Sequence, residues 1–212
     1  PADGQYFVKV HDFLYRGGTD YGYRLIAGTG PHIDYVLPPS GTPGSTSTYT
    51  LFGRNLPGGQ DAGVKLNGRP LQKLNVSISL PKEESTLQTS VLLPSAEAAV
   101  DAISYVHKSP FGSSNPVQIY LATAPVLAEK EPNDEAAQAQ QVIVPAEIGG
   151  QFQARGDTDY YDFTAKAGEV LYIEVFGQRN GGSVDAYFTL EQVTKNDKGV
   201  ETVKRITIQD DN

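Results

Sequence analysis

The chain has 212 residues, 39% of them hydrophobic, and a formal net charge of −8 at pH 7. This charge argues against a nucleic-acid partner, because binding to phosphates requires clustered Lys and Arg. The chain contains no cysteine, which excludes disulfide scaffolds, thiolate zinc sites and cysteine nucleophiles. It also lacks a run of about 18 apolar residues, so we expect no insertion into a membrane.

The first 29 residues contain two strand-like segments. Residues 5–10 and 21–27 are rich in strand-forming side chains, and residues 16–20 (RGGTD) have the composition of a turn. The pattern predicts a hairpin, which is marginal by itself and must pack on something else. No charged-then-apolar signal precedes it, and we interpret residue 1 as a cut within a longer polypeptide.

Residues 30–124 alternate between short runs of strand-forming residues and turn signals rich in Gly and Pro. We predict strands over residues 33–37, 48–53, 64–66, 74–80, 87–93, 100–107 and 117–122. Seven or so short strands in about 90 residues indicate an antiparallel, Ig-like sandwich. Residues 95–102 (SAEAAVDA) fit one or two helical turns equally well, and the sequence leaves that alternative open.

Residues 125–212 begin with an acidic segment, and the strand pattern returns after Pro145. Pro132 favours an extended Glu131, and Asn133 or Asp134 is placed to cap a short helix made of the following Ala/Gln run. The predicted strands cover residues 148–153, 160–165, 170–176, 186–193 and 202–208. They indicate a second sandwich that is incomplete within this chain.

The middle of the chain resembles a known group of Ig-like domains. The matching stretches are residues 31–36 (PHIDYV), 39–41 (PSG), 49–56 (YTLFGRNL) and 64–68 (VKLNG). Together they make residues 31–123 similar to the IPT/TIG group. The resemblance implies an Ig-like β-sandwich over residues 30–124.

The remainder resembles bacterial pre-peptidase C-terminal domains, abbreviated PPC. Residues 131–134 (EPND), 156–164 (GDTDYYDFT) and 167–169 (AGE) are similar to the first part of such a domain, and residues 2–27 to its end. The implied order is a closing PPC-like hairpin over 1–29, the IPT/TIG domain over 30–124, and a PPC-like sandwich over 125–212. The predicted fold class is therefore all-β, an Ig-like β-sandwich plus a second, jelly-roll-like β-sandwich.

Six oxygen-bearing side chains form the predicted metal site: Glu129, Glu131, Asn133, Asp134, Asp157 and Asp159. In an extended segment the first three point to one side, because side chains alternate with a period of two. The last two lie on a turn led by Gly156. Ca²⁺ takes six to eight hard oxygen ligands in irregular geometry, which two such segments would provide. The alternative is a solvated linker and a polar turn.

The PPC resemblance favours the metal. Related collagen-binding domains of clostridial collagenases are calcium-bound β-sandwiches, and the resemblance places calcium ligands at about these positions. It implies a structural Ca²⁺, and it also implies a secreted, periplasmic or cell-surface bacterial protein. The implied partners are neighbouring domains of the same polypeptide, with an extracellular protein or a polysaccharide as a further possibility.

Catalytic motifs are missing from the sequence. His11, His32 and His107 are isolated, and no Gly-Xaa-Ser-Xaa-Gly stretch occurs. Four tyrosines, at positions 160, 161, 172 and 187, fit a platform for sugars, although aromatic residues in strands more often fill a core. We therefore expect no enzymatic activity.

Two functions fit these observations. The first is a spacing and interaction module that calcium stabilises at the linker between domains. The second is a substrate-targeting module that binds protein fibres or polysaccharide for an attached hydrolase. We also expect the sheet of residues 131–208 to leave an edge that residues 5–27 fill, from the same chain or from a neighbour.

Overall fold

The structure is a computed structural model that describes residues 3–82, 101–177, 184–195, 199 and 201–210. Within these ranges the regular structure is β apart from one 3-10 turn, η2 (Ala136–Gln138), and no α-helix occurs. The all-β class predicted from the spacing of turns is confirmed. No helix in the described part of the chain has the length and apolar character that crossing a membrane requires.

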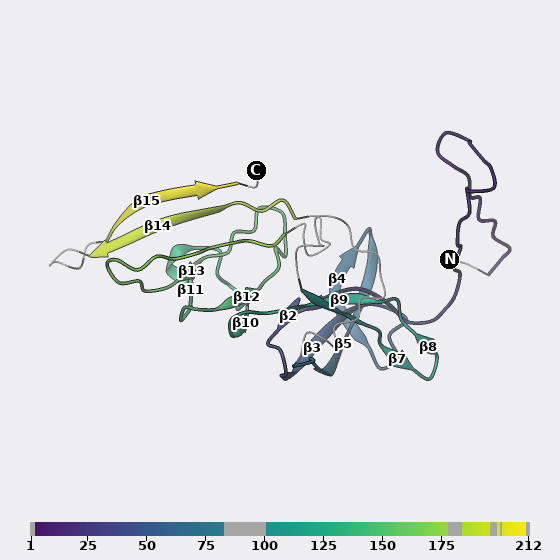
Figure 1. Cartoon of the computed structure of the whole chain (residues 1–212), viewed down its shortest axis with the longest axis horizontal. Coiled ribbons are helices and arrows are strands. Elements are labelled where there is room, and N and C mark those ends of the chain that lie inside the picture. The colour runs from purple at the N-terminus through teal and green to yellow at the C-terminus, as the bar shows by residue number, and fades with distance from the viewer. Residues whose placement is uncertain (1–2, 83–100, 178–183, 196–198, 200, 211–212) are drawn as a thin grey trace.

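Two sheets form the body of the molecule between residues 32 and 121 (Figure 1). The first is antiparallel, and its strands lie in the order β1 (His32–Leu37), β3 (Thr46–Arg54), β5 (Arg69–Ser79) and β4 (Gln60–Leu66). The second has the order β2 (Ser40–Gly41), β9 (Val117–Leu121) and β6 (Ala102–Tyr105). A small hairpin of β7 (Lys108–Ser109) and β8 (Gly112–Ser113) precedes β9.

The core lies between these two sheets. Along β3 every second side chain from Tyr49 onward is buried, as expected of a strand that turns one face inward. Tyr49 and Leu51 join one apolar cluster with Ile33 of β1 and Ile119 of β9. Because the cluster draws on both sheets, residues 32–121 form a β-sandwich.

A side chain completes the edge of the first sheet. Ile33 is buried in β1, which pairs with β3 on one side only. The carboxamide of Asn115 lies beside it, accepting from the Ile33 N–H at 2.8 Å and donating to the Ile33 carbonyl at 2.9 Å. Asn115 thus replaces a neighbouring strand at this position.

We expect Asn115→Ala to destabilise the sandwich by about 1–3 kcal/mol, because it leaves buried backbone groups of Ile33 without partners. Urea unfolding measures the change. Asn115→Asp is a second test: it keeps the acceptor, but it replaces the donor with a negatively charged oxygen that faces the Ile33 carbonyl, so it should also destabilise the sandwich. If Asn115→Ala is as stable as the natural chain, the two hydrogen bonds between Asn115 and Ile33 contribute nothing to stability.

The C-terminal half consists of three two-stranded ladders. They are β10 (Val126–Ala128) with β12 (Glu147–Gly149), β11 (Gln140–Gln141) with β13 (Tyr161–Asp162), and β14 (Phe188–Lys195) with β15 (Glu201–Gln209). The first two are parallel, and no larger sheet forms among the described residues of this half. Its buried residues within the described ranges are Asn133, Val142 and Gly149. Polar contacts therefore organise this half more than an apolar core does.

Several predicted elements are absent. Residues 3–29 contain no strand and are exposed throughout, so the hairpin predicted over 5–27 was wrong, and this segment does not fill an edge of the same chain. No strand forms over 170–176 either. Strand-forming composition makes a strand only where a neighbour supplies the ladder, which explains both differences. The strand predicted over 87–93 and most of the helical alternative at 95–102 lie outside the described residues.

The short helix after the acidic segment is reduced to η2, and its cap differs from the prediction. The N-cap is Glu135, which makes no capping hydrogen bond with its side chain. Asn133 is fully buried, its N–H donates to Glu131 Oε2 at 3.1 Å and its carbonyl accepts from the Tyr160 N–H at 2.9 Å. These bonds hold Asn133 in the site described below, so it does not cap the helix.

Candidate metal site

The acidic segment follows β10, where the chain leaves the sandwich (Figure 1). The two halves meet beside it. A side chain added at Gly149 would come within 2.8 Å of Pro39 and 3.0 Å of Pro38, so these backbones are in close contact. Gln151 Nε2 also donates to the Tyr35 hydroxyl across the joint, at 3.4 Å.

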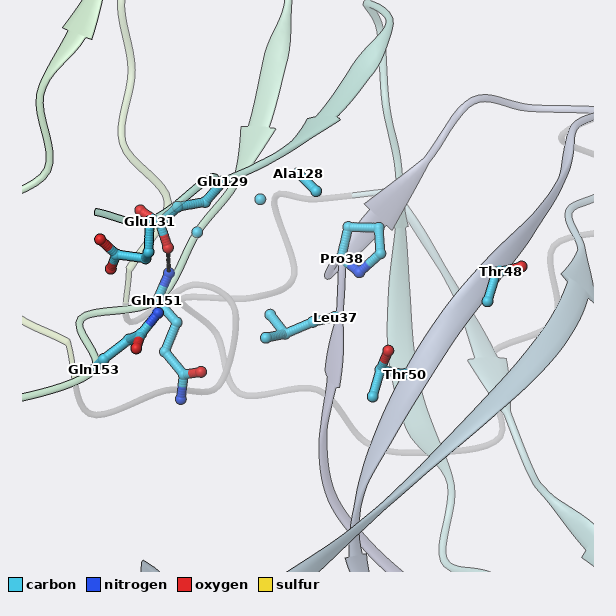
Figure 2. A pocket seen from close by; sticks show the side chains of 11 residues that line it. Leu37, Pro38, Thr48, Thr50, Ala128, Glu129, Glu131, Gln151 and Gln153 are labelled. Carbon is cyan, nitrogen blue, oxygen red and sulfur yellow. Dashed lines mark hydrogen bonds between the residues drawn. The ribbon is translucent and has the colours of Figure 1, made fainter. Parts of the chain in front are cut away.

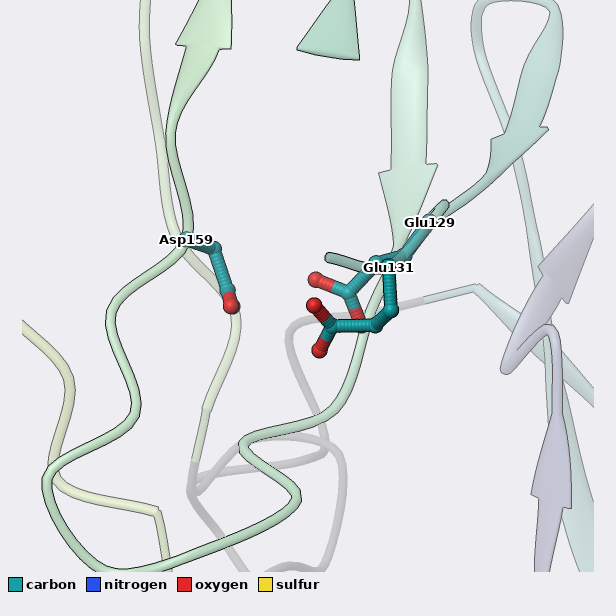
Figure 3. A group of neighbouring side chains, drawn as sticks. All are labelled: Glu129, Glu131 and Asp159. Carbon is teal, nitrogen blue, oxygen red and sulfur yellow. The ribbon is translucent and has the colours of Figure 1, made fainter. Parts of the chain in front are cut away.

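Three carboxylates converge at this place. One oxygen from each of Glu129, Glu131 and Asp159 lies within 4.8 Å of the others. The two glutamates come from the segment after β10, and Asp159 comes from the segment before β13 (Figure 3). The structure thus brings together side chains that are up to 30 positions apart in the sequence.

Glu129 is held in a fixed position. Its Oε1 accepts from the Tyr161 hydroxyl at 2.8 Å, and its Oε2 accepts from the Gln151 N–H at 2.8 Å. Both donors are neutral, so they orient the carboxylate without cancelling its charge. Among the ion pairs of the described residues, none involves Glu129, Glu131 or Asp159.

Asp159, and Asn133 in the acidic segment, have buried polar atoms without hydrogen-bond partners. The Asn133 side chain is fully buried, and neither its Oδ1 nor its Nδ2 makes a hydrogen bond within the described structure. Asp159 Oδ1 is likewise buried and unbonded. Leaving a buried polar group unsatisfied costs about 1–3 kcal/mol, more for a charged group. A cation that bound the two oxygens would therefore stabilise the folded chain.

The electrostatics of the cluster also favour a bound cation. Burial raises the pKa of Asp159 to about 7, and the neighbouring negative charges of Glu129, Asp157 and Glu131 add to the rise. Burial and the hydrogen bond to Glu129 also raise the pKa of Tyr161. A positive ion at the centre would relieve this repulsion.

The remaining two predicted residues form a pair of their own. The pKa of Asp134 is raised, chiefly by a hydrogen bond between its carboxyl group and that of Asp157. The pKa of Asp157 is lowered, mainly because its carboxylate accepts the Gln153 N–H and so closes the turn before Gly156. Asp157 also lies close enough to Asp159 to raise that group's pKa. The pair of Asp134 and Asp157 therefore lies next to the three converging carboxylates but does not belong to that cluster.

A surface pocket of about 310 Å³ opens beside the cluster (Figure 2). Leu37, Pro38, Thr48 and Thr50 line it on the sandwich side, and the C-terminal half contributes Glu129, Glu131 and the segment from Gly149 to Gln153. The pocket gives solvent, and hence ions, access to the carboxylates at the joint.

The donor set fits a hard cation. Ca²⁺ binds oxygen at about 2.3–2.6 Å, so two of its ligands are at most about 5 Å apart, and the 4.8 Å spread of the carboxylates meets that limit. The three carboxylates provide oxygen ligands only, without nitrogen or sulfur. Asn133, whose backbone N–H donates to Glu131, adds a buried carboxamide oxygen that has no hydrogen-bond partner. Bidentate carboxylates and water would complete six to eight ligands.

Sequence reasoning missed the groups that position Glu129. Tyr161 was interpreted as a core or sugar-stacking residue, yet it is half-buried and its hydroxyl binds Glu129. Gly150 was not singled out, although a methyl group added there would lie 2.9 Å from Glu129 Oε1 and 3.0 Å from the Tyr161 hydroxyl. Neither contact carries a local sequence signal, because each depends on how β12 and β13 lie around the acidic segment.

We expect Gly150→Ala to leave the fold intact and to weaken calcium binding about tenfold, the equivalent of about 1.4 kcal/mol. The reason is that the added methyl group meets side-chain ends, the Glu129 carboxylate and the Tyr161 hydroxyl, rather than backbone, and so displaces that carboxylate without disturbing the fold. Calorimetric titration checks this. Gly22→Ala, which meets nothing within 4 Å, is the control. Equal calcium affinities of the two variants would show that Glu129 is not a ligand.

Comparisons of the chain with protein-family models, with curated proteins and with solved structures found no match. The assignment of this site therefore depends on its geometry and chemistry, and the resemblance to IPT/TIG and PPC domains stays a prediction. The feature that identifies the site is the convergence of Glu129, Glu131 and Asp159 on one point at the joint between the two halves.

Proposed function

We propose that this chain is a non-catalytic, calcium-binding spacing and interaction module of a larger secreted or cell-surface bacterial protein. One Ca²⁺, held by Glu129, Glu131 and Asp159 with the Asn133 carboxamide oxygen, joins the acidic segment to the strand that begins at Tyr161. Because the acidic segment is also the connection from the sandwich, the ion stiffens the joint between the two halves.

The convergence of the three carboxylates carries this proposal. Carboxylates gathered at one point repel each other, and at neutral pH a bound cation is the group that would hold them together. The net charge of −8 favours binding of cations, and the PPC resemblance of residues 131–169 points to calcium in particular.

The surroundings of the histidines support a non-catalytic role. His11 stacks on Tyr15, and Nε2 of His32 lies 3.8 Å from Asp34. Nδ1 of His107 lies 3.3 Å from the Tyr105 hydroxyl. Each ring thus has a nearby partner that suits a structural role, and none belongs to the carboxylate cluster.

Calcium titration by calorimetry tests the proposal, with small-angle X-ray scattering as the readout of the joint. We expect one strongly bound ion per chain and a narrower distribution of overall dimensions with calcium than with chelator. Glu131→Gln should weaken the binding, whereas Glu135→Gln, which removes an equal charge from the next turn, should not. Absence of a binding heat at millimolar calcium would refute the proposal.

A further inference from the structure

The outer surface of the first sheet carries a row of uncharged polar side chains. β3 buries Tyr49 and Leu51 in the core, so the residues that alternate with them point outward. Three of these residues oppose three of β5 in the ladder: Thr46 with Ser79, Thr48 with Ser77, and Thr50 with Asn75. We call these six residues the hydroxyl row. Their side chains are neutral, although 20% of the chain's residues are charged, so the row does not select a charged partner.

Apolar side chains lie beside the hydroxyl row on the same face of the sheet. Tyr35 of β1 and Phe52 of β3 are ladder partners, and their rings stack with centroids 4.6 Å apart. Leu37, two residues further along β1, is the ladder partner of Thr50. All three apolar side chains are half-buried and so keep part of their surface exposed. Such a surface suits sugars, because a sugar ring has an apolar face of C–H groups and a rim of hydroxyl groups.

The pocket of about 310 Å³ at the joint encloses one end of the hydroxyl row. Thr48 and Thr50 line it on one side, and Gln151 and Gln153 line it on the other (Figure 2). Leu37 points into the space between them. This volume lies at the lower end of the range for small-ligand pockets, about 300–1,000 Å³. The pocket therefore suits a small unit of a longer molecule that continues along the open part of the row.

Both walls of the pocket keep hydrogen-bonding capacity for a ligand. The Thr48 hydroxyl and the Gln153 carboxamide make no hydrogen bond within the described part of the chain. The Thr50 hydroxyl donates to Asn75 Oδ1 at 2.9 Å, which leaves its oxygen able to accept. Hydroxyl and carboxamide groups both donate and accept, as the hydroxyl groups of a sugar do. The polar groups of the pocket thus match a ligand that is rich in hydroxyls.

The charge around the pocket favours a neutral ligand. Glu129 and Glu131 also line it, but their carboxylates point toward Asp159 and away from the hydroxyl row (Figures 2 and 3). The other lining residues are uncharged. An anion in the pocket would meet the repulsion of these nearby carboxylates, which disfavours acidic polysaccharides and nucleic acids.

We propose that the hydroxyl row and the pocket together form a cleft that binds a neutral carbohydrate chain. One sugar unit occupies the pocket, with its C–H face on Leu37 and its hydroxyl groups bonded to Thr48 and Gln153. Neighbouring units of the chain lie along the open part of the row. Because these contacts come from neutral groups, the inference goes beyond the proposed calcium site and does not depend on a bound ion.

Nuclear magnetic resonance titration of the natural chain at millimolar calcium tests the ligand class. The probes are neutral hexasaccharides of glucose, xylose, mannose and N-acetylglucosamine, with the acidic hexasaccharide of galacturonic acid for comparison. We expect at least one neutral probe to shift the amide signals of residues 48–50 and 151–153, and the acidic probe to leave them unchanged. A preference for mannose indicates the glycan of a glycoprotein, and a preference for another neutral probe indicates a polysaccharide. The proposal is overturned if no neutral probe shifts these signals, or if the acidic probe shifts them as strongly.

Matched variants separate the cleft from the calcium site. Thr48→Val keeps the shape of the side chain and removes its hydroxyl, so affinity for the bound neutral probe should fall about 3–10-fold, as for one lost hydrogen bond. The double variant Thr48→Val, Gln153→Ala should lose at least tenfold and still bind calcium like the natural chain. Thr189→Val makes the same change on the exposed surface of β14 and should bind sugar like the natural chain. Equal sugar affinities of the double variant and Thr189→Val would contradict the proposal.

Discussion

Millimolar calcium should raise the melting temperature of the chain by about 5–10 °C over its value in chelator. A ligand that binds only the folded state adds RT ln(1 + [L]/Kd), about 2.7 kcal/mol at a hundredfold excess over Kd. For a chain of about 150–250 residues, each kcal/mol shifts the melting temperature by about 2–4 °C. Differential scanning calorimetry with calcium and with chelator measures the shift.

The size of the shift should depend on the converging carboxylates. The double variant Glu129→Gln, Asp159→Asn removes two of the three and should melt at the same temperature with and without calcium. Without calcium it should be at least as stable as the natural chain, because it no longer brings repelling charges together. Glu135→Gln removes one negative charge at a neighbouring position and should keep the full shift. Identical melts of the natural chain under both conditions would contradict the proposed function.

Calcium affinity should fall about 50-fold between pH 7 and pH 5, because the competing proton weakens it by a factor of 1 + 10^(pKa − pH). Burial and the surrounding carboxylates raise the pKa of Asp159 to about 7, so below that pH an incoming ion must displace a proton. Displacing one proton costs a factor of about ten in affinity for each pH unit. Calorimetric titration at a series of pH values checks the slope, and Asp159→Asn should remove it.

The stability of the calcium-free chain should move in the opposite direction. The pKa of Asp159 is higher in the folded chain than its ordinary value of 3.8. Between about pH 4 and pH 7 the folded state therefore keeps a proton that the unfolded state has lost, and stability decreases as pH rises. A saturating calcium concentration should remove this decrease, because the ion-bound folded state no longer keeps the proton. A calcium-free chain that gains stability over the same range would show that another group dominates.

The sandwich was largely predictable because its signals are local. The turn at Asn67–Gly68 has both residues at positive φ, 52° and 75°, the backbone that this pair favours between two strands. The strands on either side of it, β4 and β5, were predicted as residues 64–66 and 74–80. Here alternation, turn chemistry and burial agree, so the sequence alone indicated the architecture.

The outer segments were less predictable, because they depend on pairing between distant parts of the chain. Residues 5–10 and 170–176 have the composition of strands, yet neither joins a ladder in the described structure. The parallel pairing of β10 with β12 was also missed, since three-residue strands give almost no periodic signal. Composition shows that a segment is able to form a strand, and only a partner makes it one.

The candidate site shows the same division. The period of two along residues 129–133 correctly indicated that Glu129 and Glu131 lie together. The approach of Asp159 was predicted from the number of oxygen ligands that Ca²⁺ takes and from the family resemblance, because no local rule brings residue 159 to residue 129. Contacts from Tyr161 and Gln151 that fix Glu129 are tertiary, and the sequence carried no sign of them.

A crystal structure of the chain grown with calcium tests the central claim most directly. We predict an ion between Glu129, Glu131 and Asp159, with carboxylate oxygens at about 2.3–2.6 Å and the Asn133 carboxamide oxygen turned toward it. The contradicting result is a structure in which these three carboxylates point apart into solvent and no density for an ion lies among them.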